Sequence, residues 1–136
     1  MVALRSLLAF AALTLAAPPI TPIQPSDDPF YALPSADDLK AAQPGQILRH
    51  RTPPLPIAAL GVKPLNLKSS HQILYKSIDS LGNDTATVLT VAVPYNADYR
   101  KVLSYQVAED AAWINCAPSY ALQFGSHSKL FGTIPR

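Results

Sequence analysis

The sequence contains little charge, few glycines and a single cysteine. Only 15% of its 136 residues are Asp, Glu, Lys or Arg, and the formal net charge is +2. That charge is too small to indicate a nucleic-acid partner. The three histidines and one cysteine show no spacing typical of a zinc site. We therefore expect no nucleic acid, no metal ion and no cofactor.

Proline and apolar residues are abundant by comparison. The chain has 14 prolines against 5 glycines, which indicates long irregular tracts. Hydrophobic residues make up 49% of the sequence, enough for one modest packed core. The composition therefore predicts a small folded domain with a proline-rich extension.

Residues 1–16 have the pattern of a secretory signal peptide. Arg5 supplies the positive charge near the start, and an apolar run that is too short to span a bilayer follows at residues 7–16. Thr14 and Ala16 are the small residues that cleavage after Ala16 requires. No later segment reaches membrane length. We expect an extracellular, secreted protein without a transmembrane segment, and the sequence does not indicate its oligomeric state.

The lone cysteine, Cys116, is unusual for a secreted protein. In an oxidising compartment it indicates an intermolecular bond, a free thiol, or a partner outside this chain. We favour a partner outside the chain, because the sequence ends soon after a strand pattern has begun and no helix follows that would cover a sheet.

Residues 17–69 are interpreted as a proline-rich extended arm that carries one short helix. Six prolines fall in residues 18–34, so we expect that stretch to be extended on the surface. Ser35 is a typical helix N-cap, and Pro44 with Gly45 would end a helix over residues 36–43. A brief strand is predicted over residues 46–51.

Residues 70–136 are expected to form a second unit built on strands. Residues 71–79 and 85–93 flank a stretch rich in turn-forming residues, which predicts an antiparallel hairpin. A third strand is predicted over residues 102–108, inside the sheet because it is apolar on both faces. It ends at the acidic pair Glu109 and Asp110. Residues 117–124 are compatible with either a helix or an irregular crossing.

The chain lacks a complete set of catalytic residues. There is no G-x-S-x-G motif, the strand-turn-helix sequence that exposes a nucleophilic serine. Ser126 and His127 are adjacent, so their side chains point apart in an extended chain and form no dyad. His50 is expected to be solvated and His71 to be a satisfied position on a sheet edge. Four cations are interpreted as solubilising charges: Arg49, Arg51, Lys63 and Lys68.

Asn83, Asp84 and Thr85 form an N-x-T glycosylation motif. The motif lies in a predicted turn of a chain that has a predicted leader. We therefore expect Asn83 to carry an N-linked glycan, although an unmodified asparagine would suit the turn equally well.

Several ordered motifs together resemble the N-terminal part of the fungal secretory lipases, which are secreted α/β-hydrolases acting on triacylglycerols and other lipid esters. The motifs are DDPFY (27–31), PGQILRHR (44–51), LYKSIDSLGNDTATVLTVAVPYNAD (74–98), KVLSYQ (101–106), ED (109–110) and CAPSY (116–120). The resemblance implies an incomplete α/β-hydrolase fold, with an antiparallel hairpin and a third strand after the proline-rich arm. Members of the family are longer, and their serine, aspartate and histidine lie beyond the end of this chain.

The resemblance also assigns roles to two residues. It implies that Asp110 contributes a backbone NH to the oxyanion hole, and that Cys116 forms a disulfide with a cysteine outside this chain. The expected function is that of an N-terminal lipase fragment, inactive alone because the catalytic triad is absent. The alternative is a secreted noncatalytic binding or decoy module derived from a lipase.

Overall fold

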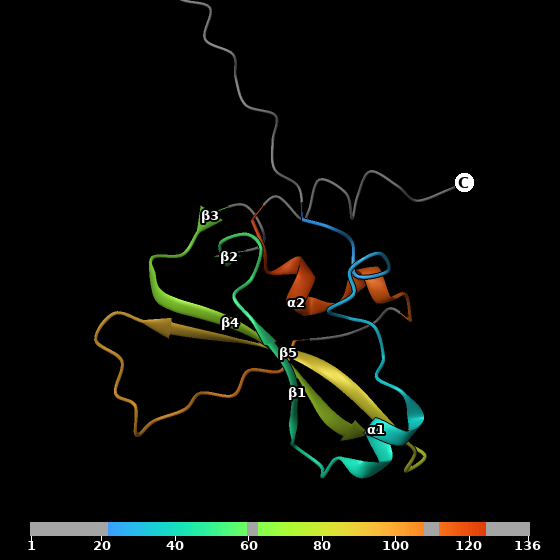
Figure 1. Ribbon diagram of the computed structural model, residues 1–136. Coiled ribbons are helices and arrows are strands. Elements are labelled where there is room, and N and C mark those ends of the chain that lie inside the picture. The colour runs from blue at the N-terminus through green and yellow to red at the C-terminus, as the bar shows by residue number, and fades with distance from the viewer. Residues whose placement is uncertain (1–21, 60–62, 108–111, 125–136) are drawn as a thin grey trace, which may run out of the picture.

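The computed structural model describes residues 22–59, 63–107 and 112–124. Its centre is an antiparallel sheet of three strands in the order β1-β4-β5, formed by β1 (Ile47–Arg51), β4 (Leu67–Ile78) and β5 (Asp84–Pro94) (Figure 1). A two-stranded sheet pairs β2 (Ala58–Ala59) with β3 (Lys63–Pro64). The helical elements are α1 (Ala36–Ala41), the 3-10 turn η1 (Ile114–Cys116) and α2 (Pro118–Ala121).

The predicted hairpin is confirmed. β4 begins earlier than predicted, at Leu67, and ends at Ile78, while β5 extends one residue beyond each predicted limit. β4 and β5 pair continuously from Ser69 opposite Val93 to Ile78 opposite Asp84. In the turn, the carboxylate of Asp79 accepts hydrogen bonds from the backbone NH of Leu81 at 2.9 Å and of Asn83 at 2.8 Å. The hydrogen bond from the Asn83 side chain, and after it those from the backbone, lower the pKa of Asp79. Local turn chemistry therefore sets the register of the hairpin.

Side chains alternate between the two faces of β4, as in any strand. Gln72, Leu74 and Lys76 are buried on one face, which is covered by the proline-rich arm and the segment that contains α2. His71 and Ile73 lie on the opposite face and are only half-buried. The buried face is unusually polar, because two of its three central side chains carry hydrogen-bonding groups.

Lys76 is one of these groups, and it forms an ion pair with Asp84. The Lys76 side chain is 3% exposed, whereas that of Asp84 is 44% exposed. We predict that Asp84→Asn lowers the free energy of unfolding by about 2 kcal/mol, because it leaves a buried ammonium without its counter-charge. Lys76→Met should change it by less than about 1 kcal/mol, because the remaining carboxylate can be hydrated. Urea unfolding followed by circular dichroism measures both values, and equal losses would contradict the prediction.

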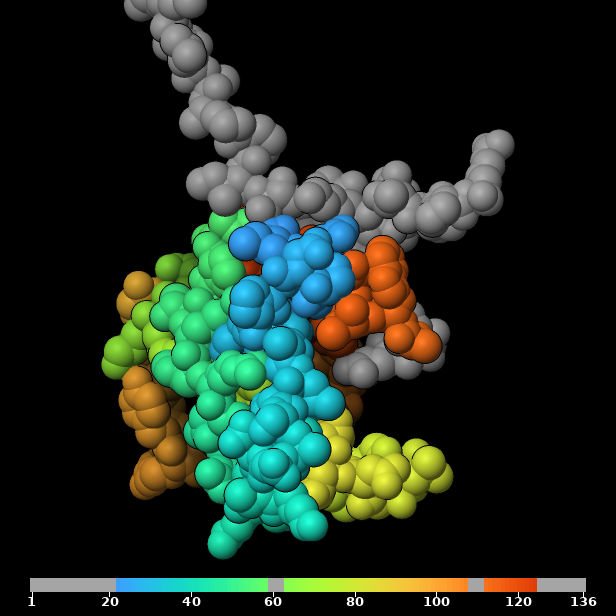
Figure 2. Space-filling model, turned by 45° about the vertical axis from the view of Figure 1, so that its right-hand side comes forward, coloured from blue at the N-terminus to red at the C-terminus, as the bar shows by residue number. Residues whose placement is uncertain are grey.

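The arm differs from the expected extended tract. Residues 25–27 and 29–31 form turns, and Pro22, Pro25, Asp28 and Tyr31 are buried. Figure 2 shows the arm (blue to cyan) lying between the region that contains β1 (green) and residues 112–124 (orange). The expectation of an extended surface arm is therefore wrong for these residues. Asp28 forms an ion pair with Arg51 of β1, and the Tyr31 hydroxyl contacts Ser119.

The short helix and the first strand are confirmed with altered limits. Ser35 Oγ accepts a hydrogen bond from the backbone NH of Asp38 at 3.1 Å, as an N-cap does. The helix ends at Ala41, two residues earlier than predicted, because Ala42 is already extended. Leu39 is its buried residue. A bulge interrupts the pairing of β1 with β4 between Ile47 and Arg49.

The third strand is the main error of the sequence analysis. Residues 101–107 have no strand structure, and residue 108 lies outside the described part of the chain. Val102 is 93% exposed, Leu103 91% and Tyr105 80%. The stretch belongs to the long loop that leaves the end of β5 (orange in Figure 1). An apolar run forms a strand only where a partner strand supplies hydrogen bonds and a covered face, and the described residues offer it none.

The helices of the described part of the chain are all too short or too polar to cross a lipid bilayer.

Candidate functional site

The residue expected to carry chemistry, the proposed oxyanion donor Asp110, lies outside the described part of the chain with its neighbour Glu109. Ser126 and His127, which were expected to form no dyad, also lie outside it. The structure does describe both flanks of the acidic pair. Residues 101–107 are largely exposed, whereas residues 112–124 are anchored to the arm, to β4 and to the loop after β1.

The first anchor connects η1 to the arm. Asn115 Oδ1 accepts a hydrogen bond from the backbone NH of Ser26 at 2.8 Å, and Asn115 Nδ2 donates to Gln24 Oε1 at 3.4 Å. Asn115 itself is buried. The side chain therefore ties the chain just after the acidic pair to a segment about ninety residues earlier in the sequence.

The second anchor connects the end of this segment to the loop after β1. The backbone NH of Ala58 donates to Leu122 O at 2.8 Å, and that of Phe124 donates to Pro56 O at 2.9 Å. Gln123 is buried, and its Oε1 accepts from the backbone NH of Leu55 at 3.3 Å. α2 (Pro118–Ala121) is thus anchored on both sides. The sequence was compatible with either a helix or an irregular crossing over residues 117–124, and the structure has a short helix there.

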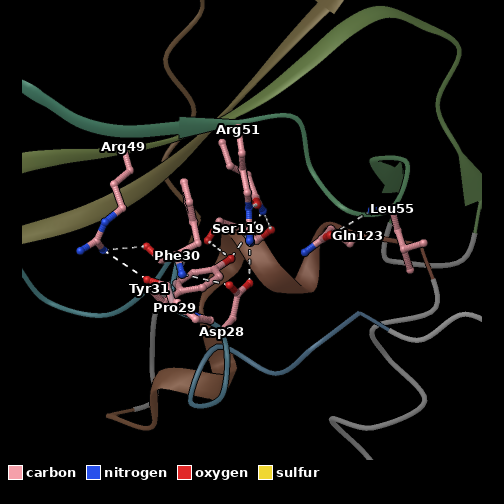
Figure 3. Close-up of polar contacts among 10 residues, drawn as sticks. Asp28, Pro29, Phe30, Tyr31, Arg49, Arg51, Leu55, Ser119 and Gln123 are labelled. Atoms are coloured by element: carbon pink, nitrogen blue, oxygen red, sulfur yellow. Dashed lines mark hydrogen bonds and ion pairs between the residues drawn. The ribbon is translucent and has the colours of Figure 1, made fainter.

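A buried group of polar side chains joins the arm, the sheet and α2. We call it the arm cluster, and it consists of Asp28, Tyr31, Arg51, Gln72 and Ser119. Arg51 Nη1 lies 2.7 Å from Asp28 Oδ2, and Arg51 Nε donates to Gln72 Oε1 at 2.8 Å. The Tyr31 hydroxyl and Ser119 Oγ are 2.9 Å apart, and Gln72 Nε2 donates to Ser119 O at 2.7 Å. Figure 3 shows Arg51 reaching from β1 toward Asp28.

Burial raises the pKa of Tyr31, although its hydrogen bond with Ser119 acts in the opposite direction. The Ser119 hydroxyl is therefore paired with a phenol that remains protonated at neutral pH, which cannot act as a base. A nucleophilic serine requires a basic partner such as histidine. The arm cluster therefore positions segments and performs no acyl transfer.

Two arginines interpreted as solubilising charges have structural contacts instead. Arg51 is half-buried, and its guanidinium carbon lies 4.0 Å from the centre of the Phe30 ring. Arg49 Nη1 donates to the backbone carbonyl of Phe30 at 3.2 Å and to that of Ala32. The interpretation is wrong for both residues, because each guanidinium binds the arm. The two-residue spacing of Arg49 and Arg51 along β1 places them on one face of the strand, and this spacing could have indicated their shared contacts.

The two described histidines lie together, which the sequence analysis missed. His50 Nε2 is 3.0 Å from His71 Nδ1. His71 stands on β4, the central strand of the sheet, so the expectation of an edge position is wrong. The residues are 21 positions apart, and only the pairing of β1 with β4 brings them into contact.

The structure also describes the proposed glycosylation site and the lone cysteine. Asn83 is exposed in the hairpin turn, where its Nδ2 donates to Asp79 Oδ2 at 2.9 Å. Cys116 is a half-buried free thiol. Within residues 22–59, 63–107 and 112–124, no group of three or more His, Cys, Asp or Glu side chains could hold a metal ion.

Two fungal proteins that are similar to this chain are both named as lipases. Lipase A of Arthroderma benhamiae is 54% identical over 114 residues, which are 83% of this chain and 24% of that lipase. Lipase 4 of Candida albicans is 50% identical over 107 residues, which are 79% of this chain and 23% of that lipase. The chain belongs to this family of fungal lipases. It spans about a quarter of the length of the curated lipases that it matches. No family model matches the sequence.

A solved lipase structure supports the same relationship in three dimensions. Candida antarctica lipase A in its closed state aligns with a TM-score of 0.62 at 33% sequence identity. The alignment covers 78% of this chain and 23% of that lipase. The family relationship and the three-stranded antiparallel sheet are consistent with a partial α/β-hydrolase fold, as the motifs implied.

Proposed function

We propose that this chain is the N-terminal part of a secreted lipase that hydrolyses carboxylic ester bonds of triacylglycerols, and that it is inactive alone. The observation that carries the proposal is the 54% identity with a fungal lipase over 83% of the chain. In the complete enzyme, a serine attacks the ester carbonyl, a histidine takes its proton, and backbone amides stabilise the tetrahedral oxyanion. These nucleophile, acid and base residues are supplied by the remainder of the enzyme.

Asp110 is proposed to donate one of the backbone hydrogen bonds of the oxyanion hole. The support comes from the segment that follows it in the sequence: residues 112–124 are fixed by buried Asn115, Ser119 and Gln123. A preorganised donor needs such a rigid flank, because an oxyanion hole that reorganises during the reaction loses most of its effect. The arm cluster therefore supports catalysis indirectly, by holding the chain that follows the donor.

The exposed apolar stretch at residues 102–107 supports the proposal that this chain is part of a larger protein. Val102 and Leu103 point to opposite faces of an extended chain, yet both are more than 90% exposed. Contiguous exposed apolar residues generally mark a surface that another part of a protein covers. We propose that residues 102–107 become a strand when the remaining three quarters of the lipase are present. Cys116 would then pair with a cysteine of that remainder.

An exchange experiment tests the proposed function. The segment of Arthroderma benhamiae Lipase A that aligns with this chain is replaced by the chain's own sequence, and secretion and hydrolysis of a p-nitrophenyl ester are measured. We expect the hybrid to hydrolyse the ester and the isolated chain to show only the background rate. Enzyme-like hydrolysis by the isolated chain, abolished by Ser126→Ala, would refute the claim of inactivity. A well-secreted and folded hybrid without activity would refute the lipase assignment.

The second candidate function is a secreted noncatalytic binding module, favoured by the same exposed apolar stretch at residues 102–105. Flotation of the isolated chain with phosphatidylcholine vesicles containing triolein tests it. Lipid binding that is lost in Leu103→Asp would support this function. Its absence would leave the fragment with no role outside the complete lipase.

Export and glycosylation are proposed together. Residues 1–16 are proposed to be a leader cleaved after Ala16, and Asn83 to carry a glycan. Asn83 is exposed at the tip of the hairpin, where a glycan can be attached. We predict that chain secreted by a yeast begins at Ala17 and loses mass on treatment with peptide-N-glycosidase F. Thr85→Ala should remove the glycan and Thr85→Ser should retain it. An unmodified mass for the Thr85→Ser variant would contradict the prediction.

A further inference from the structure

The contact between His50 and His71 joins two strands on the face of the sheet opposite the arm cluster. His50 Nε2 and His71 Nδ1 are 3.0 Å apart, and the ring centres are 5.1 Å apart with the planes inclined by 34°. His50 is exposed and His71 is half-buried. Their contact therefore lies at the exposed surface of the sheet. Their contact plays no part in the proposed lipase chemistry.

A serine orients the inner ring of this pair. His71 Nε2 lies 3.2 Å from Ser69 Oγ. When Nε2–H donates to that hydroxyl, the lone pair of the neutral ring is at Nδ1 and faces His50 Nε2. Metal-binding histidines in proteins commonly have this arrangement, in which a hydrogen bond at one nitrogen fixes the tautomer and frees the other nitrogen for the metal.

The separation of the two nitrogens suits a shared metal ion. Two imidazole nitrogens bound to one ion at about 2.0–2.1 Å lie roughly 2.9–3.4 Å from each other, for angles between 90° and tetrahedral. The observed 3.0 Å lies in that range. A bound ion would take the place of the hydrogen bond that joins the two rings.

The two arginines next to His50 are directed away from the pair. Arg49 and Arg51 flank His50 in sequence, but both guanidinium groups point to the other face. There Arg51 contacts Asp28 and Arg49 contacts arm carbonyls. The approach of a divalent cation to the two rings is therefore not opposed by the guanidinium of Arg49 or Arg51.

We propose that His50 and His71 form a two-imidazole site for a divalent transition-metal ion of borderline softness, such as Ni²⁺ or Zn²⁺. Imidazole is the ligand that these ions favour, and water would complete the coordination sphere. Because one ligand comes from β1 and the other from β4, a bound ion would tie the two strands together. It would stabilise the folded chain, since the unfolded chain does not hold the two rings in contact. The inference is independent of the proposed lipase function.

Titration of the full chain with NiCl₂ tests the proposal. The chain carries Cys116→Ser so that the thiol does not compete, and binding is followed by calorimetry. We expect one ion per chain, with affinity at least about tenfold lower in His50→Gln and in His71→Gln and about tenfold lower in Ser69→Ala. His127→Gln is the matched control, because it removes the remaining histidine, and its affinity should equal that of the parent.

A second measurement avoids the risk that a variant misfolds. In the chain that retains all three histidines, paramagnetic Ni²⁺ should broaden the imidazole proton signals of two histidines at substoichiometric concentration and leave the third sharp. Nickel should also raise the unfolding temperature of the parent and of His127→Gln, but not of His50→Gln. Three results would each overturn the proposal. These are absence of nickel binding, unchanged nickel binding in each of the variants His50→Gln and His71→Gln, and signal broadening centred on His127.

Discussion

Replacing Asp110 by proline in the lipase hybrid should lower kcat for ester hydrolysis about 10²–10³-fold, the usual effect of losing one oxyanion-hole donor. Proline has no backbone NH, so it removes the proposed hydrogen bond at its source. The Asp110 carboxylate takes no part in that bond. Asp110→Ala should therefore retain most of the activity, and the contrast between the two variants identifies the backbone as the functional group.

Comparing the effects on kcat and on KM distinguishes a lost oxyanion-hole donor from weaker ester binding. A donor that acts on the tetrahedral intermediate stabilises the transition state more than the bound ester, so KM should change little. The secreted yield and circular dichroism of Asp110→Pro must match those of Asp110→Ala for the comparison to hold. If alanine and proline reduce kcat equally, the side chain is the functional group and the proposed role of Asp110 is wrong.

Asp28→Asn should destabilise the isolated chain by about 3 kcal/mol, since removing one member of a buried ion pair leaves an uncompensated charge. The side chain of Asp28 is 9% exposed and that of Arg51 is 21% exposed. Arg51 would keep its bond with Gln72 but lose its only carboxylate contact in the described part of the chain. Asp28 Oδ1 also accepts from the backbone NH of Phe30 at 3.0 Å, so the turn of the arm weakens as well.

Asp27→Asn is the matched control for Asp28→Asn. Asp27 is the preceding residue, has the same chemistry and is exposed, so its substitution should change stability by less than about 0.5 kcal/mol. Urea unfolding followed by circular dichroism gives both values. Equal stabilities of the two variants would show that the arm cluster does not hold the arm to the sheet. In the lipase hybrid, Asp28→Asn should also reduce activity, because it loosens the segment that follows Asp110.

The elements predicted correctly from the sequence are those set by short-range interactions. The hairpin depends on Asp79, Gly82 and Asn83, which form their turn within five residues, with Gly82 in the left-handed region at a φ of 84°. The N-cap at Ser35 likewise needs only Asp38. Such contacts can be recognised in the sequence because the partners are neighbours, and tertiary packing changed only the ends of these elements.

The errors arose where the partner is distant. Residues 102–107 have the composition of a buried strand, yet composition does not provide the neighbouring strand that pairing requires. The prolines of the arm correctly indicated irregular structure, but they gave no sign that Asp28 and Tyr31 would enter a buried cluster. Arg49 and Arg51 were misread for the same reason, since their partners lie about twenty residues earlier.

The sequence by itself determined the family, the hairpin and the first helix, because motif order and turn chemistry are properties of the linear chain. Tertiary structure alone decided which polar side chains are buried and which histidines meet. Arg51 contacts Asp28, and His50 contacts His71, only after β1 has paired with β4 and the arm has folded across the other face. Both contacts depend on strand register, which fixes the face on which each side chain lies and cannot be derived from the composition of either strand.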